Sequence, residues 1–118
     1  MTKMTESKDK QWVTVCNTDD LVNDSGICAL LNDTEQVAIF KLPNSEEQIF
    51  AIGNFDPIGK ANVISRGIVG CIGGEPVVAS PLYKQHFSLK TGRCLQEEQI
   101  SLNTFPVRIE QTDVQVFI

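Results

Sequence analysis

Short apolar runs that end at turn residues dominate this sequence. The runs recur about every 8–12 residues, the spacing typical of all-β sandwiches and barrels. Most are rich in β-branched or aromatic residues, as strands are, and no long stretch has the 3.6-residue periodicity of an amphipathic helix. The strands predicted in this way cover residues 12–16, 27–31, 35–42, 48–52, 67–72, 75–79, 86–89, 106–110 and 114–118. We therefore predict an all-β fold, an antiparallel β-sandwich or partial barrel.

Two hairpins stand out in the pattern. Gly73 and Gly74 separate two of the predicted strands, and glycine readily takes the positive φ that a tight hairpin turn requires. The C-terminal hairpin turns at residues 111–113, and apolar residues alternate along both of its strands, as they do in half-buried strands. The residues predicted to share its apolar faces are Val107 and Ile109 on one strand, and Val114, Val116 and Ile118 on the other.

The composition is that of one globular domain. The chain has 118 residues, of which 42% are hydrophobic and 21% charged, and this length suffices for one independent core. Its formal charge of −5 argues against a nucleic-acid-binding protein and against a basic membrane-surface protein. No apolar run approaches the ~18 residues of a membrane span, so no membrane association is expected.

The first ten residues differ from the rest of the chain. Residues 1–10 are polar, include three lysines and offer nothing that anchors to a core. We therefore predict a flexible N-terminus over residues 1–10 and one domain over residues 11–118. Residues 1–10 also lack the apolar h-region of a signal peptide, so the cytoplasm is the predicted compartment.

Four cysteines are widely spaced along the chain. Cys16, Cys28, Cys71 and Cys94 form no C-x-x-C pair, and none lies two or three positions from His86, so the spacing does not suggest a zinc or iron–sulfur site. We expect all four to be buried as small hydrophobic residues. A disulfide between two of them is the alternative.

No self-sufficient active site is apparent in the sequence. His86 is the single histidine, and a lone histidine at the start of a strand is usually a packed or surface residue. There is no G-x-S-x-G motif of a serine hydrolase. In the pairs Glu46-Glu47 and Glu97-Glu98, neighbouring side chains point to opposite sides of an extended chain, so solvation is expected rather than a carboxylate dyad. We predict no catalytic residue.

Two segments resemble the cluster-binding loops of Rieske domains. The first, residues 50–58 (FAIGNFDPI), is similar to an apolar strand, an Asn or Asp, and then the family's C-P-H. The second, residues 77–94, is similar to an apolar strand followed by C-P-x-H, a Phe-Asp pair and a Thr-Gly turn. The prolines and the turn stand where the family places them, at Pro57, Pro81, Thr91 and Gly92.

The resemblance covers about residues 11–118 and implies a Rieske-like fold with a small loop-bearing subdomain at about residues 53–89. The family's four cluster ligands are replaced. The residues at the first Cys, first His, second Cys and second His are Asp56, Ile58, Ser80 and Tyr83. A Rieske centre needs two thiolates on one iron and two imidazoles on the other, and these side chains supply neither. The resemblance therefore implies a Rieske-like domain with no metal and no cofactor on this chain.

The segment 62–70 (NVISRGIVG) resembles the small subunits of assimilatory NAD(P)H-dependent nitrite reductases. This implies a non-catalytic subunit of a cytoplasmic oxidoreductase, whose partner is the large subunit. In that family the large subunit carries flavin, an iron–sulfur cluster and sirohaem, and reduces nitrite to ammonium in nitrate assimilation. Two other functions remain open: a ferredoxin-like electron-transfer component of an oxygenase that binds iron through other ligands, and a free-standing interaction or small-molecule module.

The tips of the two loops are the predicted partner-binding surface, because apolar and aromatic residues there are costly to leave in water. The residues are Phe55, Pro57 and Ile58 on the first tip, and Pro81, Leu82 and Tyr83 on the second. A second expectation, which does not exclude the first, is that the two loops pack on each other and fill the vacated cluster volume, with the ring of Tyr83 closing the gap. Asp56 is expected to cap backbone N–H groups of its own turn.

Predictions are also made for three side chains outside the loop tips. Arg66 and Arg108 are candidates for ion pairs, either with acidic residues of a large subunit or with those of this chain. Trp12 is expected to pack the N-terminal strand. His86 receives no role.

Overall fold

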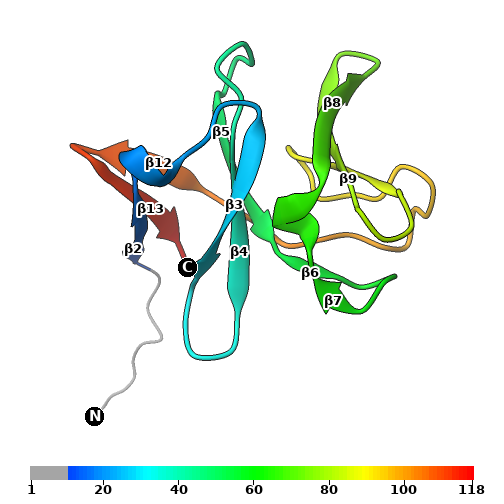
Figure 1. Ribbon diagram of the computed structural model, residues 1–118, viewed down its shortest axis with the longest axis horizontal. Coiled ribbons are helices and arrows are strands. Elements are labelled where there is room, and N and C mark those ends of the chain that lie inside the picture. The colour runs from blue at the N-terminus through cyan, green and yellow to red at the C-terminus, as the bar shows by residue number, and fades with distance from the viewer. Residues whose placement is uncertain (1–10) are drawn as a thin grey trace.

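The computed structural model describes residues 11–118, and the predicted flexible N-terminus, residues 1–10, lies outside the described residues. The fold is all-β, as predicted, with two single-turn 3-10 helices (Figure 1). The first half contains β2 (Trp12–Asn17), η1 (Thr18–Asp20), β3 (Ser25–Leu30), β4 (Gln36–Lys41), β5 (Ile49–Gly53), β6 (Phe55–Asp56) and β7 (Ala61–Asn62). The second half contains η2 (Ile64–Arg66), β8 (Ile68–Ile72), β9 (Glu75–Ala79), β10 (His86–Ser88), β11 (Thr104–Phe105), β12 (Val107–Glu110) and β13 (Asp113–Phe117). Every strand predicted from the sequence is present, with ends that move by one or two residues.

The strands form four antiparallel sheets. A central sheet has the order β11-β5-β4-β3, and it lies between a sheet of order β12-β13-β2 and the loop-bearing subdomain (Figure 1). The subdomain contains the sheet β10-β9-β8 and the two-stranded ribbon β6-β7. The Rieske-like arrangement of a main β-structure with a smaller loop-bearing part is therefore present.

The central sheet is buried on both faces, which explains why β4 is a continuous apolar run. Val37 and Ile39 belong to one core cluster with Val114 and Val116 of β13. The intervening residues belong to a second core cluster, with residues of β9 and β10. This cluster includes Ala38, Phe40, Phe50, Ile52, Val78 and Phe87. Alternate side chains of β4 point to opposite faces of the central sheet, so this strand contributes to both core clusters.

The first and last described strands pair with each other. In β13 and β2, Phe117 lies opposite Trp12, and the register shifts between Val114 and Gln115. Beyond the pair, the Gln11 N–H donates to the Ile118 carbonyl at 2.8 Å, and the Ile118 N–H donates back at 3.1 Å. The two ends of the described chain therefore lie side by side.

Trp12 packs the N-terminal strand, as predicted, and Arg108 lies against it. The rings of Trp12 and Phe117 are 5.1 Å apart at their centroids. The guanidinium of Arg108 lies 4.3 Å from the centroid of the Trp12 ring, and its Nε donates to Gln115 Oε1 at 2.8 Å. Arg108 thus contacts an aromatic ring and an amide within residues 11–118.

Two expectations from the sequence are wrong in detail. Ile109 is exposed at 49% although Val107 is half-buried, because no described element covers the outer part of β12. Only Cys94 of the four cysteines is fully buried: Cys28 and Cys71 are exposed and Cys16 is half-buried, because short strands at sheet edges leave alternate side chains outside the core. All four thiols are free, so no disulfide forms.

Candidate functional site

The first loop leaves β6 and is organised by Asp56, which is fully buried. One carboxylate oxygen, Oδ1, accepts the N–H groups of Ile58 at 2.9 Å and Gly59 at 3.1 Å. The Asp56 carbonyl also accepts the Lys60 N–H at 2.6 Å. Asp56 therefore caps its own turn, as predicted, and satisfies backbone groups that the loop would otherwise leave unpaired.

The second loop repeats this arrangement after β9. Ser80 is buried, and its Oγ accepts the Leu82 N–H at 3.3 Å. The Ser80 carbonyl accepts the Lys84 N–H at 3.0 Å. The segments D-P-I-G-K and S-P-L-Y-K thus fold alike, each with a polar first residue, a proline second and a lysine fifth.

The two loops are joined through their first residues. Ser80 Oγ donates a hydrogen bond of 2.5 Å to Asp56 Oδ2. Next to this bond, Leu82 lies directly against Gly59: a Cβ added at Gly59 would lie 3.2 Å from Leu82 Cβ and 3.1 Å from Asp56 Oδ2, and would overlap the end of the Leu82 side chain. The expectation that the loops pack on each other is therefore correct.

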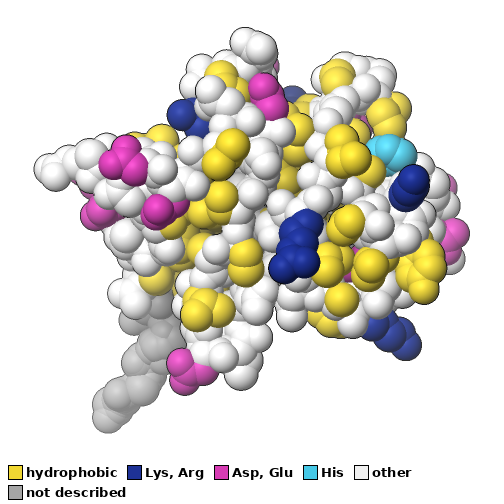
Figure 2. Space-filling model, viewed as in Figure 1, with side chains coloured by type: hydrophobic (Ala, Val, Ile, Leu, Met, Phe, Trp, Pro, Cys, Tyr) yellow, Lys and Arg dark blue, Asp and Glu magenta, His cyan; other side chains and the backbone are white. Residues whose placement is uncertain are grey.

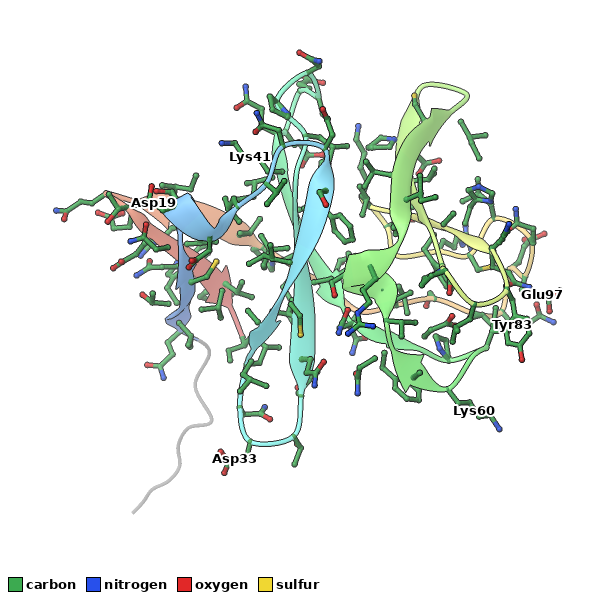
Figure 3. The ribbon with its side chains drawn as sticks, viewed as in Figure 1. Asp19, Asp33, Lys41, Lys60, Tyr83 and Glu97 are labelled. Atoms are coloured by element: carbon green, nitrogen blue, oxygen red, sulfur yellow. The ribbon has the colours of Figure 1, made fainter. Side chains whose placement is uncertain are left out.

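The four ligand-equivalent residues do not fit a [2Fe-2S] cluster. Asp56 and Ser80, at the thiolate positions, use their oxygens on each other and on backbone N–H groups. Ile58 is hydrocarbon and packs against the core cluster that contains Phe87. Tyr83 is 64% exposed and points outward (Figure 3). No group of three or more His, Cys, Asp or Glu side chains within residues 11–118 could hold a metal ion instead.

The outward position of Tyr83 corrects one expectation, namely that its ring closes the gap between the loops. The loop ends in a left-handed residue, Lys84 at φ 64°, which directs the chain back toward β10. The hydrogen bond between Asp56 and Ser80, with Leu82 against Gly59, already joins the loops. The loops are thus joined without the ring of Tyr83, which lies in solvent.

The predicted partner-binding residues gather at one end of the molecule. Phe55 is 49% exposed, Leu82 45% and Tyr83 64%, and Pro81 is also exposed. Pro57 and Ile58 are half-buried. Figure 3 shows Tyr83 and Lys60 projecting at this end, with Asp19 at the opposite end. The loops therefore place apolar side chains in solvent on a base that hydrogen bonds hold in place.

A buried amide, at a residue not among the predicted site residues, fixes the start of the first loop. Asn54 is 1% exposed, and its Nδ2 donates to Gln36 Oε1 at 2.9 Å. Its Oδ1 accepts the Ser65 N–H at 2.7 Å. Asn54 thereby connects β4, the first loop and η2. One indication of this role is visible in the sequence: Asn54 stands directly before the loop, where the Rieske pattern has Asn or Asp.

His86 follows the second loop and Arg66 ends η2, and neither belongs to a catalytic arrangement within residues 11–118. His86 Nδ1 lies 3.2 Å from Gln96 Nε2, and the His86 N–H donates to Gln96 Oε1 at 2.8 Å. Arg66 is exposed at the end of η2. Cys28 is exposed as a residue, but partial desolvation of its sulfur raises the pKa of the thiol and outweighs the opposing effect of the Arg66 guanidinium.

Comparison with known proteins agrees with this geometry. A family model described as the Rieske-like [2Fe-2S] domain matches residues 11–117. This chain belongs to the Rieske-like domain family. The match covers both loops, so this Rieske-like domain has the family's fold in the region of Asp56 and Ser80. None of the helices in residues 11–118 is long and apolar enough to cross a membrane.

Several of the similar proteins are named as subunits of nitrite reductases. The Escherichia coli (strain K12) nitrite reductase (NADH) small subunit is 45% identical over 106 residues, which are 90% of this chain and 96% of that protein. The solved structure of the E. coli protein NirD superposes with a TM-score of 0.82 at 44% identity, covering 93% of this chain and 98% of that one. A Klebsiella oxytoca nitrite reductase [NAD(P)H] large subunit is 37% identical over 107 residues, which are 91% of this chain and 11% of that protein.

Proposed function

We propose that this chain is a small subunit of an NAD(P)H-dependent nitrite reductase that holds no cofactor and acts by docking on the large subunit through its loop tips. The large subunit would carry flavin, an iron–sulfur cluster and sirohaem and reduce nitrite to ammonium during nitrate assimilation. NADH and NADPH are intracellular reductants, so we place this function in the cytoplasm. Residues 11–118 would act together as one domain.

The joined loops are the observation that supports this proposal. At the positions where the family has metal ligands, Asp56 and Ser80 bind each other and the loop backbone. Beyond them, Phe55, Leu82 and Tyr83 expose apolar surface. Oxygens engaged in this way are poor iron ligands, whereas exposed aromatic and aliphatic residues on a rigid base are typical of a protein–protein contact.

The Klebsiella relative supports the choice of partner. A segment 37% identical to this chain occurs within a protein named as a large subunit. In that protein, a domain similar to this chain is therefore part of the large-subunit polypeptide itself. We extend this association to a separate chain that binds noncovalently.

Co-purification tests the proposal. The full chain is co-expressed with a nitrite reductase large subunit from the same organism, and a tag on the large subunit is used for capture. We expect a stable complex, and we expect Leu82→Ala with Tyr83→Ala to reduce the captured small subunit by about tenfold, as truncation of central interface residues does. The matched control is Val22→Ala with Leu30→Ala, two exposed apolar residues at 55% and 64% outside the loops.

Metal analysis of the isolated chain separates this proposal from the electron-transfer alternative. After anaerobic reconstitution with iron and sulfide, we expect no visible absorbance and no stoichiometric iron. About two irons per chain with a Rieske-type spectrum would refute a cofactor-free subunit. Failure of the unmodified chain to co-purify with the large subunit would refute the subunit role.

A further inference from the structure

The exposed apolar side chains are concentrated in the part of the chain that includes the loops. Nine large hydrophobic residues are exposed in residues 11–118, and six of them lie between positions 55 and 95. These six are Phe55, Ile68, Ile72, Leu82, Tyr83 and Leu95. Three are not at the loop tips predicted from the sequence, so the apolar surface is larger than the tips.

Ile68 is the most exposed residue of this set, at 78%. It lies on the edge strand β8, opposite Ala79 of β9, and Ala79 lies opposite His86 of β10. Residues that are paired in this way point to the same face of a sheet. Ile68, Ala79 and His86 therefore form one row across the outer face of the sheet β10-β9-β8.

This row adjoins the second loop. The loop begins at Ser80, directly after Ala79, and returns to the sheet at His86. In Figure 2 the yellow side chains over β8 and β9 lie beside the cyan histidine, which is His86, the single histidine of the chain. The outer face of this sheet and the tip of the second loop thus lie next to each other, and both expose apolar side chains.

Charge is segregated in the same way along the chain. The loop-bearing subdomain, residues 53–89, contains three basic and two acidic residues, a formal charge of +1. The remaining described residues, 11–52 and 90–118, contain four basic and eleven acidic residues, a formal charge of −7. One of the two acidic residues of the subdomain, Asp56, is fully buried. The subdomain therefore carries a positive formal charge in an acidic protein.

Two lysines take corresponding positions at the ends of the loops. Lys60 and Lys84 are the fifth residues of the two loop segments, and both are exposed. Both have left-handed backbone, with φ of 59° and 64°, and their N–H groups bond to the first residue of the loop. Because the backbone at both lysines is hydrogen-bonded, the origin of each side chain is fixed relative to the apolar surface. Glu97, which follows Gln96, lies at the same end of the molecule as Tyr83 (Figure 3).

We propose that the docking face extends from the loop tips over the outer face of the sheet β10-β9-β8, with Ile68 as an apolar anchor and Lys60 and Lys84 as its charged margin. It fits a surface of the large subunit that presents an apolar recess bordered by Asp or Glu side chains. This inference rests on the proposed function and specifies the surface that performs it.

The charge pattern orients the complex. An acidic surface on the large subunit attracts the loop-bearing subdomain and repels the rest of this chain, whose charge has the same sign. Complementary charges of this kind raise the association rate and suppress wrong orientations, and their effect weakens as salt screens them. The apolar contact at Ile68 then governs how slowly the complex dissociates.

Binding kinetics of the two purified full-length subunits test the inference. Ile68→Thr keeps a β-branched side chain on the strand, and its control is Leu30→Thr, at a strand residue 64% exposed on the far sheet edge. Lys60→Glu with Lys84→Glu reverses both charges of the margin. Neither change adds or removes a glycine at these positions of positive φ, so the backbone strain stays similar. The control for this double variant is Lys90→Glu with Arg93→Glu, an equal change of net charge at the opposite end of the β9-β10 hairpin. Thermal unfolding confirms that each variant is folded.

We expect Ile68→Thr to weaken the affinity about tenfold, mainly through faster dissociation, whereas Leu30→Thr has no effect. We expect the Lys60 and Lys84 double variant to slow association about tenfold at low salt and to lose most of the salt dependence, unlike its control. If the unmodified chain binds but both test variants bind as their controls do, the extended face is wrong while the subunit role stands. If the unmodified chain does not bind, both fail.

Discussion

Ser80 and Asp56 are 24 positions apart, yet the Ser80 hydroxyl donates to the Asp56 carboxylate at 2.5 Å in a fully buried contact between two loops. Removing the hydroxyl leaves a buried carboxylate oxygen without its partner, which costs about 1–3 kcal/mol. We therefore expect Ser80→Ala to lower the free energy of unfolding by that amount, measured by urea denaturation. Ser101→Ala, at an exposed serine, is the control. Equal stability of the two variants would contradict the role of this bond.

Gly59 is predicted to be needed for the contact between the loops. A methyl group at this position displaces Leu82 and crowds the Asp56 carboxylate, so Gly59→Ala should destabilise the protein by about 1–3 kcal/mol, as overpacking does. Gly70→Ala is the control, because a Cβ there meets no atom within 4 Å. Thermal unfolding compares the two. The prediction fails if Gly59→Ala is no less stable than Gly70→Ala.

Arg108 is predicted to stabilise the terminal sheet through its contact with Trp12. The guanidinium lies over the indole ring at 4.3 Å, and such contacts contribute about 0.5–1 kcal/mol at exposed sites. Arg108→Ala should lose this amount and also change the fluorescence of Trp12, the single tryptophan of the chain. Arg108→Lys keeps the charge without the planar group, so it should recover only part of the stability. Full recovery by lysine would show that charge alone matters.

Cys16 is predicted to respond to pH between about 9 and 11. Burial, aided by the charge of Asp20, raises the pKa of the Cys16 thiol from 9.0 to about 11. Folding thus favours the protonated thiol, and its contribution to stability is present below pH 9 and lost as pH rises through 11. At pH 9, alkylation monitored by mass spectrometry should be slower at Cys16 in the folded chain than in urea. Exposed Cys71 should react readily and buried Cys94 should be protected. Equal rates at Cys16 in the folded and unfolded chain would contradict the raised pKa.

The strand pattern was predictable from sequence because alternation and short apolar runs reflect burial directly. β4 is the clearest example: four consecutive buried residues indicate a strand covered on both faces. Ile109 and the exposed cysteines were not predictable in the same way. Periodicity shows which side chains share a face, but it does not show whether another element covers that face.

The joined loops were only partly predictable. The resemblance located Asp56 and Ser80 opposite the family's cysteines, and the turn chemistry of Asp56 followed from its residue type. The hydrogen bond between them joins residues far apart in sequence, so it depends on how the sheets place the loops. Ile68 escaped detection for a related reason, because an isoleucine in a strand usually indicates the core.

The hydrogen bonds between Gln11 and Ile118 close the described polypeptide almost into a ring. Another domain could therefore be fused at either end of residues 11–118, or at both ends, without displacing a strand from its sheet. The same architecture can thus serve as a separate partner or as a built-in module, and evolution can move between the two forms with the hydrophobic interior untouched.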